Sequence, residues 1–170
     1  MVNQESQPEC LIVIQPTPFC NINCRYCYLP TRNSTAQISE HVLQKIFEEV
    51  LNSPYLQDCY LRFVWHAGEP LIVSPNFYRA AFELLREKNQ KLNHIRKFSH
   101  SLQTNGILIN PSWVSLFEEY DIEVGVSLDG PDFIHDSSRV DRSGKSTHVK
   151  VMHGIRLLQE ANIHFGIIMV

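Results

Sequence analysis

Short apolar runs alternate with helix-like segments along most of this chain of 170 residues, and this alternation limits the fold more than any other feature. Three of the helix-like segments begin at good helix starts, namely Ser39, Ser74-Pro75 and Asn110-Pro111. A fourth helix is expected from about residue 147 to residue 160, where apolar residues again recur at helical spacing. Strands are expected at residues 11–14, 60–65, 98–104, 122–128 and 163–170.

Strands that alternate with helices in this way form a parallel sheet, either an open doubly wound sheet or a barrel. The run at 122–128 favours the barrel, because Val124 and Val126 share one face while Gly125 and Ser127 share the other. A sheet with helices on both sides would be apolar on both faces. The expected fold is therefore α/β, an incomplete TIM-like barrel of about four βα units plus a fifth strand. Its site would lie at the C-terminal strand ends.

The chain ends on the expected fifth strand, and an unpaired apolar edge is a liability for an independent domain. We therefore expect either a fragment of a longer protein or a chain that another chain completes. Residues 1–9 are interpreted as an N-terminal tail and residues 10–170 as the N-terminal part of a core domain.

Charge and targeting signals exclude several classes of function. Fifteen Lys and Arg against eighteen Asp and Glu give a net charge of −3, so no basic field indicates a nucleic-acid or membrane partner. The N-terminal residues lack the apolar core of a secretory signal, and no apolar run reaches membrane-spanning length. A cytoplasmic location is expected.

Three of the five cysteines crowd into one short segment, as Cys20-x-x-x-Cys24-x-x-Cys27. In a reducing compartment such clustering indicates metal or redox chemistry rather than disulfides. Three thiolates suffice for three corners of a cubic iron–sulfur cluster and leave one iron open. Zinc and unligated cysteines remain alternatives, although a structural zinc site normally takes four ligands. Cys10 and Cys59 are interpreted as small buried apolar residues.

The segment Cys20 to Tyr28 resembles the CX3CXΦC signature of the radical S-adenosylmethionine (SAM) superfamily, with Tyr26 as the aromatic residue Φ. Gly68-Glu69-Pro70 resembles the GGEP segment of that superfamily. The run from Ser127 to Pro131 resembles its SLDGP segment. Each of the three motifs follows an expected strand, which makes a chance match far less common than for a lone motif.

The resemblance implies two cofactors, a [4Fe-4S] cluster and SAM. Cys20, Cys24 and Cys27 would bind the cluster, which reductively cleaves SAM to a 5′-deoxyadenosyl radical that abstracts a substrate hydrogen. The remaining expected contacts are with SAM. They involve the ring of Tyr26, the backbone carbonyl of Gly68 and the carboxylate of Glu69 near the methionine ammonium, the hydroxyl of Ser127, and Arg139 as the carboxylate clamp. Arg142 competes with Arg139 for the last role, and either can instead be a solvated surface arginine.

Within the superfamily the chain most resembles the peptide-modifying branch with a C-terminal SPASM domain. In particular, the segments 15–20 (QPTPFC), 65–71 (WHAGEPL) and 139–145 (RVDRSGK) look most like the maturases that form cyclophane crosslinks in glycine-rich repeat peptides. The resemblance implies a ribosomal precursor peptide as substrate, a carbon–carbon crosslink as product, and a flavodoxin- or ferredoxin-type electron donor. Formylglycine formation on a sulfatase, as in anaerobic sulfatase-maturing enzymes, is one alternative. The other is a truncated, inactive or zinc-binding module.

The chain departs from the family pattern at Ala67, which replaces the first glycine of GGEP. We expect a mild effect, provided that the backbone φ at this position is negative. The general base, the later strands and the cysteine-rich SPASM region with its auxiliary clusters are expected beyond Val170. His66 and the end of the third expected strand, from Gln103 to Asn105, are further candidates for contact with cofactor or substrate.

Overall fold

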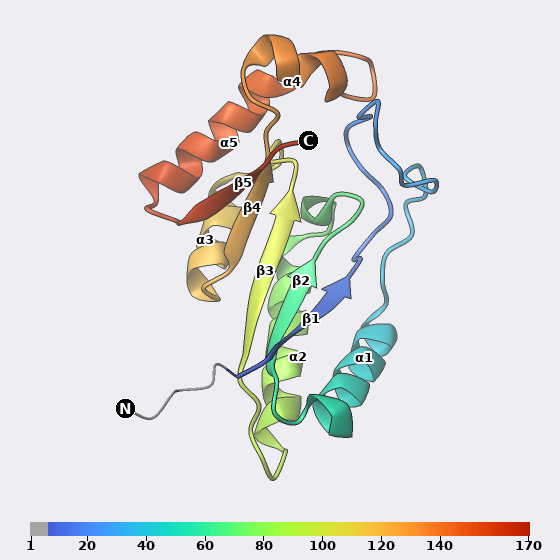
Figure 1. Cartoon of the computed structure of the whole chain (residues 1–170), viewed down its shortest axis with the longest axis vertical. Coiled ribbons are helices and arrows are strands. Elements are labelled where there is room, and N and C mark those ends of the chain that lie inside the picture. The colour runs from blue at the N-terminus through green and yellow to red at the C-terminus, as the bar shows by residue number, and fades with distance from the viewer. Residues whose placement is uncertain (1–6) are drawn as a thin grey trace.

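The computed structural model describes residues 7–170, so most of the expected tail at 1–9 lies outside the described residues. Its last residue is already part of the sheet, because the first strand begins at Glu9. Five strands alternate with helices along the chain (Figure 1). The strands are β1 (Glu9–Ile14), β2 (Tyr60–Trp65), β3 (Phe98–Thr104), β4 (Glu123–Ser127) and β5 (Phe165–Ile168).

The helices begin where their capping residues predict. The side chains of Ser39, Ser74 and Asn110 each accept a hydrogen bond from a backbone N–H in the first turn of α1, α2 and α3. The helices are α1 (Glu40–Asn52), α2 (Pro75–Gln90), α3 (Pro111–Glu119), α4 (Asp132–Ser138) and α5 (His148–Glu160), with short 3-10 helices at Pro54–Leu56 and Pro70–Ile72. The sequence patterns missed α4, which buries only His135.

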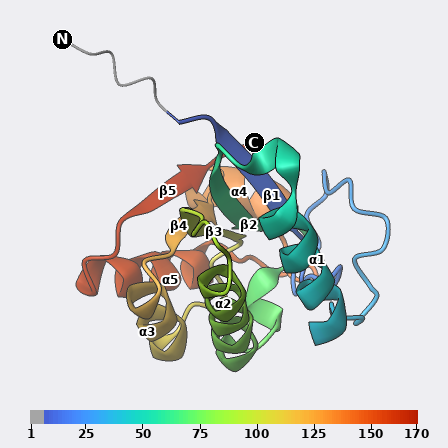
Figure 2. The ribbon, with the colours of Figure 1, turned by 90° about the horizontal axis from the view of Figure 1, so that it is seen from below.

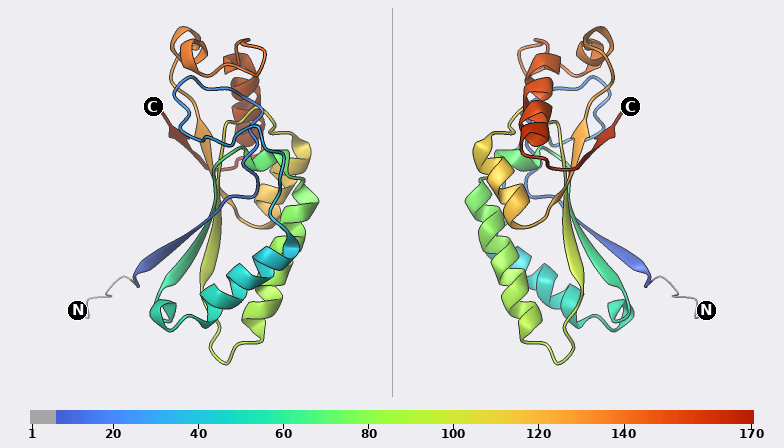
Figure 3. Two further views of the ribbon diagram at one scale, coloured as in Figure 1. Left: turned by 90° about the vertical axis from the view of Figure 1, so that its right-hand side faces the viewer. Right: turned by 90° about the vertical axis from the view of Figure 1, so that its left-hand side faces the viewer.

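All five strands are parallel and lie in the order β1-β2-β3-β4-β5. Helices α1, α2, α3 and α5 cover one face of this sheet, and the opposite face is open (Figures 2 and 3). A sequential order with helices on a single face is the arrangement of a barrel wall and not of a doubly wound sheet. The expected incomplete barrel is therefore confirmed.

The core lies between the sheet and its helices. On β2, Leu61, Phe63 and Trp65 are fully buried against the helices, while the alternate side chains are half-buried on the open face. Burial of each large apolar side chain contributes roughly 1.5–3 kcal/mol. Cys59 is buried in this core, as expected, whereas Cys10 is only half-buried against it, and all five cysteines are free. None of the helices in residues 7–170 is long and apolar enough to cross a membrane.

The long loop between β1 and α1 carries the three clustered cysteines across the C-terminal end of the sheet (Figure 1). Its backbone is held by a segment far along the chain: Asn23 N donates to Val140 O at 2.7 Å, and Arg25 N donates to Ser138 O at 2.9 Å. An isolated antiparallel bridge between Ile22 and Asp141 belongs to the same contact. The segment after α4 thus fixes the position of the cysteine loop.

Candidate functional site

The three clustered cysteines line one cavity of about 430 Å³ at the C-terminal ends of the strands. Cys20 and Cys24 are buried and Cys27 is half-buried. The other walls come from the loop after β2, the ends of β3 and β4, and Arg139. A cavity of this size is typical of a small-molecule or cofactor site. All eight predicted site residues line it: Cys20, Cys24, Tyr26, Cys27, Gly68, Glu69, Ser127 and Arg139.

The thiols do not converge on one point. Among residues 7–170, no three His, Cys, Asp or Glu side chains lie close enough to hold a single metal ion. A cubic iron–sulfur cluster makes a different demand, since each cysteine binds a different iron at a separate corner. Three thiols spread around one cavity therefore fit the cluster predicted from the spacing.

Polar groups approach two of the thiols. Asn105 Nδ2 lies 3.8 Å from Cys20 Sγ, and a terminal nitrogen of Arg139 lies 3.9 Å from Cys24 Sγ. Burial raises the pKa of the Cys20 thiol to about 11, and it also raises the pKa of Cys24 despite the nearby Arg139 guanidinium. Both donors suit sulfur that is negatively charged in the ligated state.

The loop after β2 approaches the cysteine loop through backbone alone. A Cβ at Gly68 would lie 2.1 Å from the carbonyl oxygen of Thr17, so only glycine fits there. The Glu69 N–H donates to Phe19 O at 2.8 Å and fixes the contact. The expectation of a negative φ at Ala67 is wrong: φ is +73°, because the chain turns through the left-handed region before Gly68. The substitution of the family's glycine by alanine is therefore a strained one.

The Glu69 carboxylate is 1% exposed and already accepts three hydrogen bonds. One oxygen accepts from Leu71 N at 3.0 Å and from Thr104 Oγ1 at 2.7 Å, and the other accepts from Asn105 N at 2.8 Å. Burial raises the pKa of Glu69, although these three donors oppose the effect. The carboxylate thus ties the β2 loop to the end of β3, a role that sequence reasoning did not find.

Ser127, at the end of β4, is positioned by its neighbour on β3. Gln103 Nε2 donates to Ser127 Oγ at 3.1 Å, so the hydroxyl proton of Ser127 remains free to be donated into the cavity. The Gln103 side chain reaches Ser127 by crossing over Gly125, where a Cβ would lie 2.0 Å from Gln103 Oε1. The absence of a side chain at Gly125 makes this hydrogen bond possible.

Arg139 and Tyr26 share one carboxylate oxygen of Asp129. Arg139 Nε donates to Asp129 Oδ2 at 2.9 Å and the Tyr26 hydroxyl donates to the same oxygen at 2.6 Å. The guanidinium lies over the Tyr26 ring, 5.3 Å from its centroid. Burial alone raises the pKa of Asp129, but the bonds from Arg139 and Tyr26 hold it below its usual value. Sequence reasoning missed Asp129, although it stands inside the SLDGP motif.

Arg142 points elsewhere. A terminal nitrogen donates to Cys20 O at 2.9 Å, and the guanidinium lies 5.1 Å from the centroid of the Phe19 ring. It also contacts Asn33, and it does not line the cavity. Arg142 thus braces the outside of the cysteine loop, whereas Arg139 faces the cavity.

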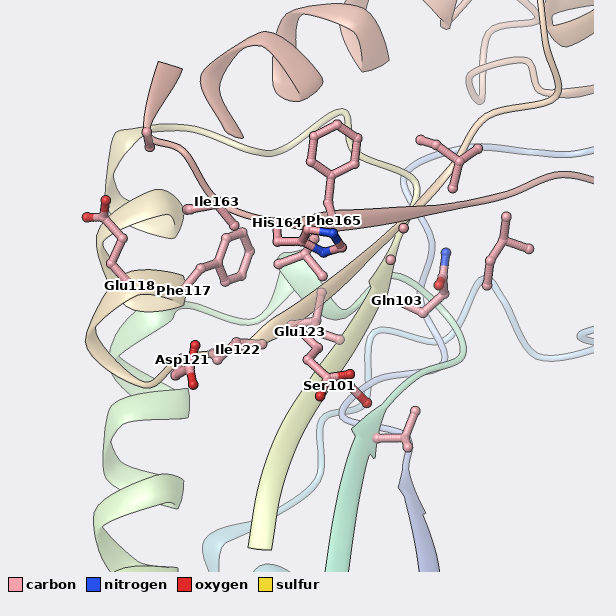
Figure 4. Close-up of a pocket in the computed structure, with 18 of the residues that line it drawn as sticks. Ser101, Gln103, Phe117, Glu118, Asp121, Ile122, Glu123, Ile163, His164 and Phe165 are labelled. Carbon is pink, nitrogen blue, oxygen red and sulfur yellow. The ribbon is translucent and has the colours of Figure 1, made fainter. Parts of the chain in front are cut away.

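Two other features adjoin the cavity. His66 lines it, but its buried Nδ1 has no hydrogen-bond partner within residues 7–170, and burial lowers its pKa. A larger hollow of about 920 Å³ runs along β3, β4 and β5 and is lined by Ser101, Gln103, Glu123 and Phe165 (Figure 4). None of the five cysteines lines this larger hollow, so we place the candidate site in the smaller cavity.

Comparisons with known proteins agree with the geometry. An uncharacterized protein of Synechocystis is 43% identical over 96% of this chain, and a serine-type anaerobic sulfatase-maturating enzyme of Bacteroides thetaiotaomicron is 35% identical over 91% of it. The chain spans 41% and 38% of the lengths of these two relatives. The solved structure of native anSMEcpe with bound AdoMet and Cp18Cys peptide matches 95% of this chain and 43% of its own, with a TM-score of 0.82 and 33% identity.

The model of the radical SAM superfamily matches residues 14–170, which include the cysteine loop and every wall of the cavity. The cofactors of this superfamily are a [4Fe-4S] cluster and SAM. On this match, and on a site that places three cysteines around one cavity, the chain belongs to the radical SAM superfamily.

Proposed function

We propose that the protein is a radical SAM enzyme that modifies a ribosomally made precursor peptide. The observation that carries this proposal is the single cavity shared by the three cysteines, the Gly68 turn and Arg139. When bound there, the cluster and SAM supply the radical chemistry that removes a hydrogen atom from the substrate. Residues 10–170 would form the N-terminal part of the core domain, a proposal supported by the share of its relatives' length that the chain spans.

In this proposal Cys20, Cys24 and Cys27 hold the cluster, and the remaining walls of the cavity hold SAM. Arg139 takes the methionine carboxylate, since a guanidinium matches a carboxylate and Arg142 faces away from the cavity. The Ser127 hydroxyl donates its free proton to the ligand.

The ammonium end of SAM is assigned to the turn at residues 67–69, and Tyr26 forms a wall beside it. The Gly68 carbonyl is the proposed acceptor for the ammonium. Because the Glu69 carboxylate is engaged with three protein donors, we propose that it acts mainly by holding this turn in place.

For the product we propose a carbon–carbon crosslink between a side-chain Cβ and a nearby aromatic ring, on the sequence resemblance described above. The second candidate is formylglycine on a sulfatase, which the similarity to sulfatase-maturating enzymes favours. A flavodoxin- or ferredoxin-type protein is the proposed electron donor. Five free thiols are typical of a reducing compartment, which supports a cytoplasmic location.

The test uses the whole protein that contains this chain, reconstituted anaerobically with iron and sulfide. A cluster signal in electron paramagnetic resonance that changes when SAM is added supports the site, and Cys24→Ala should abolish that change. Cys10→Ala, a substitution outside the loop, is the matched control. One bound zinc without acid-labile sulfide would contradict the proposal and favour a zinc module.

The two products differ in their chemistry. Candidate peptides with a glycine-rich repeat and an aromatic residue are compared with sulfatase peptides that carry serine or cysteine. The crosslink removes two hydrogens and leaves no aldehyde, whereas formylglycine reacts with a hydroxylamine probe. If no deoxyadenosine forms and every peptide keeps its mass, the proposed activity is wrong.

A further inference from the structure

Asp129 joins three separate segments at the site, although none of the sequence predictions assigned it a role. It is 2% exposed and lies two residues after the end of β4. Its Oδ2 accepts from the Tyr26 hydroxyl at 2.6 Å and from Arg139 Nε at 2.9 Å, and its Oδ1 accepts from Val170 N at 3.2 Å. One carboxylate therefore connects the cysteine loop, the segment after α4 and the end of β5.

The pairing with Asp129 determines which part of Arg139 faces the cavity. Asp129 takes the Nε donor of Arg139, so the terminal nitrogens of the guanidinium are left for the cavity, and one lies 3.9 Å from Cys24 Sγ. The main chain holds Arg139 from the other side, because its carbonyl accepts from Thr147 Oγ1. The backbone and the guanidinium of Arg139 are thus each held by a hydrogen bond, and the charge lies beside one of the proposed cluster ligands.

We propose that Asp129 is a positioning residue: it fixes Arg139 against Cys24 and thereby sets the reduction potential of the cluster at that corner. This inference rests on the proposed function, because it requires a cluster on the three cysteines. Hydrogen bonds and charges near the sulfur ligands are among the factors that set the potential of such clusters. The Arg139 guanidinium lies 3.9 Å from Cys24 Sγ and the Asp129–Arg139 pair is buried, so little water screens the effect of these two charges on the cluster.

The sign of each effect follows from charge. Reduction by dithionite adds one electron to the cluster, so a nearby positive charge favours the reduced state and a nearby negative charge opposes it. Asp129→Asn removes the negative charge but keeps an oxygen that can accept from Arg139 Nε, so the potential should rise. Arg139→Gln leaves Asp129 uncompensated, so the potential should fall.

A third substitution distinguishes the effect of Asp129 on the position of Arg139 from the effect of its own charge. Asp129→Ala removes the same charge as Asp129→Asn but also removes the acceptor that holds Arg139. If Asp129 positions Arg139, the guanidinium then moves away from Cys24, and the potential of Asp129→Ala should lie below that of Asp129→Asn. If only charge matters, the two variants should have equal potentials.

The control is Asp132→Asn, which makes the same change in net charge three residues further along the chain. Asp132 is exposed at the start of α4, and its side chain accepts only from Phe133 N among the described residues. This variant should keep the wild-type potential.

The measurement is a redox titration of the reconstituted whole protein, followed by electron paramagnetic resonance of the cluster signal that changes when SAM is added, since any auxiliary cluster gives a signal of its own. Opposite shifts for Asp129→Asn and Arg139→Gln, with Asp129→Ala below Asp129→Asn, support the inference. A wild-type protein that forms a cluster while Asp129→Asn and Arg139→Gln both keep its potential would overturn it, and so would equal potentials for Asp129→Asn and Asp129→Ala. A wild-type protein without a cluster that responds to SAM would instead contradict the proposed function. If Asp129→Ala does not fold, Asp129→Leu takes its place, because it removes the same charge and the same acceptor while filling the space.

Discussion

Ala67 has a backbone φ of +73°, a left-handed conformation that its Cβ disfavours. A left-handed φ costs a non-glycine residue roughly 1–2 kcal/mol, and glycine pays about 0.5–1 kcal/mol in chain entropy instead. Ala67→Gly should therefore raise the free energy of unfolding by about 0.5–1 kcal/mol in urea titrations. Ala80→Gly, at an exposed position inside α2, is the control with the opposite sign and should lose about 1 kcal/mol.

A single buried residue, His100, makes the free energy of unfolding depend on pH. It is buried among aromatic rings and stacks on Phe82 at 4.0 Å, and burial, with a smaller effect of Arg86, lowers its pKa from 6.5 to about 3. Between these values the unfolded chain binds a proton and the folded chain does not. Stability is therefore complete above pH 6.5 and is lost as the pH falls toward 3, by up to about 1.4 kcal/mol per pH unit.

The variant His100→Phe should flatten this dependence between pH 6.5 and pH 4, as measured by urea unfolding at several pH values. The same substitution at His41, an exposed position on α1, should leave the slope intact. An unchanged slope in His100→Phe would show that other groups cause the loss of stability in acid.

At the residue scale, the sequence indicated which residues meet at one cavity, and the roles predicted for them stay predictions. The three cysteines, Gly68 and Arg139 all line one cavity, as expected. The sequence could not distinguish Arg139 from Arg142, since the two are three positions apart and only tertiary packing turns one toward the cavity. Asp129 was missed for a related reason: an Asp-Gly-Pro sequence after a strand is typical of a turn, and its partners are 103 and 10 residues away.

At the scale of elements, Gly68 is the contact between the β2 loop and the cysteine loop. Gly68→Ala combines a positive φ with a Cβ against the Thr17 backbone, whereas a Cβ at Gly144, also at a positive φ, meets no atom of the described residues within 4 Å. Both variants carry the cost of a positive φ, so the difference between their free energies of unfolding measures the clash of the new Cβ with the Thr17 backbone. We expect Gly68→Ala to be less stable than Gly144→Ala by about 1–3 kcal/mol and to bind less iron after reconstitution. Equal stabilities would show that the two loops can separate at little cost.

Gly125 and Gly166 are paired neighbours on β4 and β5 and offer a second matched comparison. A Cβ at Gly125 displaces the flexible end of Gln103 from Ser127, whereas one at Gly166 meets nothing within 4 Å. Gly125→Ala should therefore fold but bind SAM about tenfold more weakly, as expected for the loss of one hydrogen bond. Gly166→Ala should bind normally in the same calorimetric titration. Unchanged binding in Gly125→Ala would contradict the proposed positioning of Ser127 by Gln103.

Strands and long helices were predictable because their signals are local. β2 and β3 match the predicted ranges, and the caps Ser39, Ser74 and Asn110 start their helices as expected. Helix α4 was not predictable, because it has no apolar stripe and leaves Phe133 and Ile134 exposed. It depends on tertiary contacts instead: the His135 ring accepts from Asp129 N and contacts Thr147 Oγ1.

At the scale of the whole molecule, the 170-residue chain has a distinctive sheet edge. β5 is the last strand in the sheet order, and Ile167 and Ile168 on it are 48% and 49% exposed. Such an edge is a template for pairing with another chain. We expect the isolated 170-residue chain to self-associate in sedimentation velocity and Ile167→Lys to reduce this association. Val149→Lys, on the exposed face of α5, is the control. A monodisperse monomer at high concentration would contradict the expectation.

The backbone contacts between residues 138–141 and the cysteine loop also determine when, during biosynthesis, the loop can take up its folded position. Backbone partners of Asn23 and Arg25 lie more than a hundred positions downstream, and ribosomes add about 5–20 residues per second. The backbone carbonyls of Ser138 and Val140 are therefore synthesised roughly 6–23 s after the cysteine loop. We expect iron and sulfide delivery to succeed only after that point, so that nascent chains stalled before residue 138 accept no cluster from the assembly machinery.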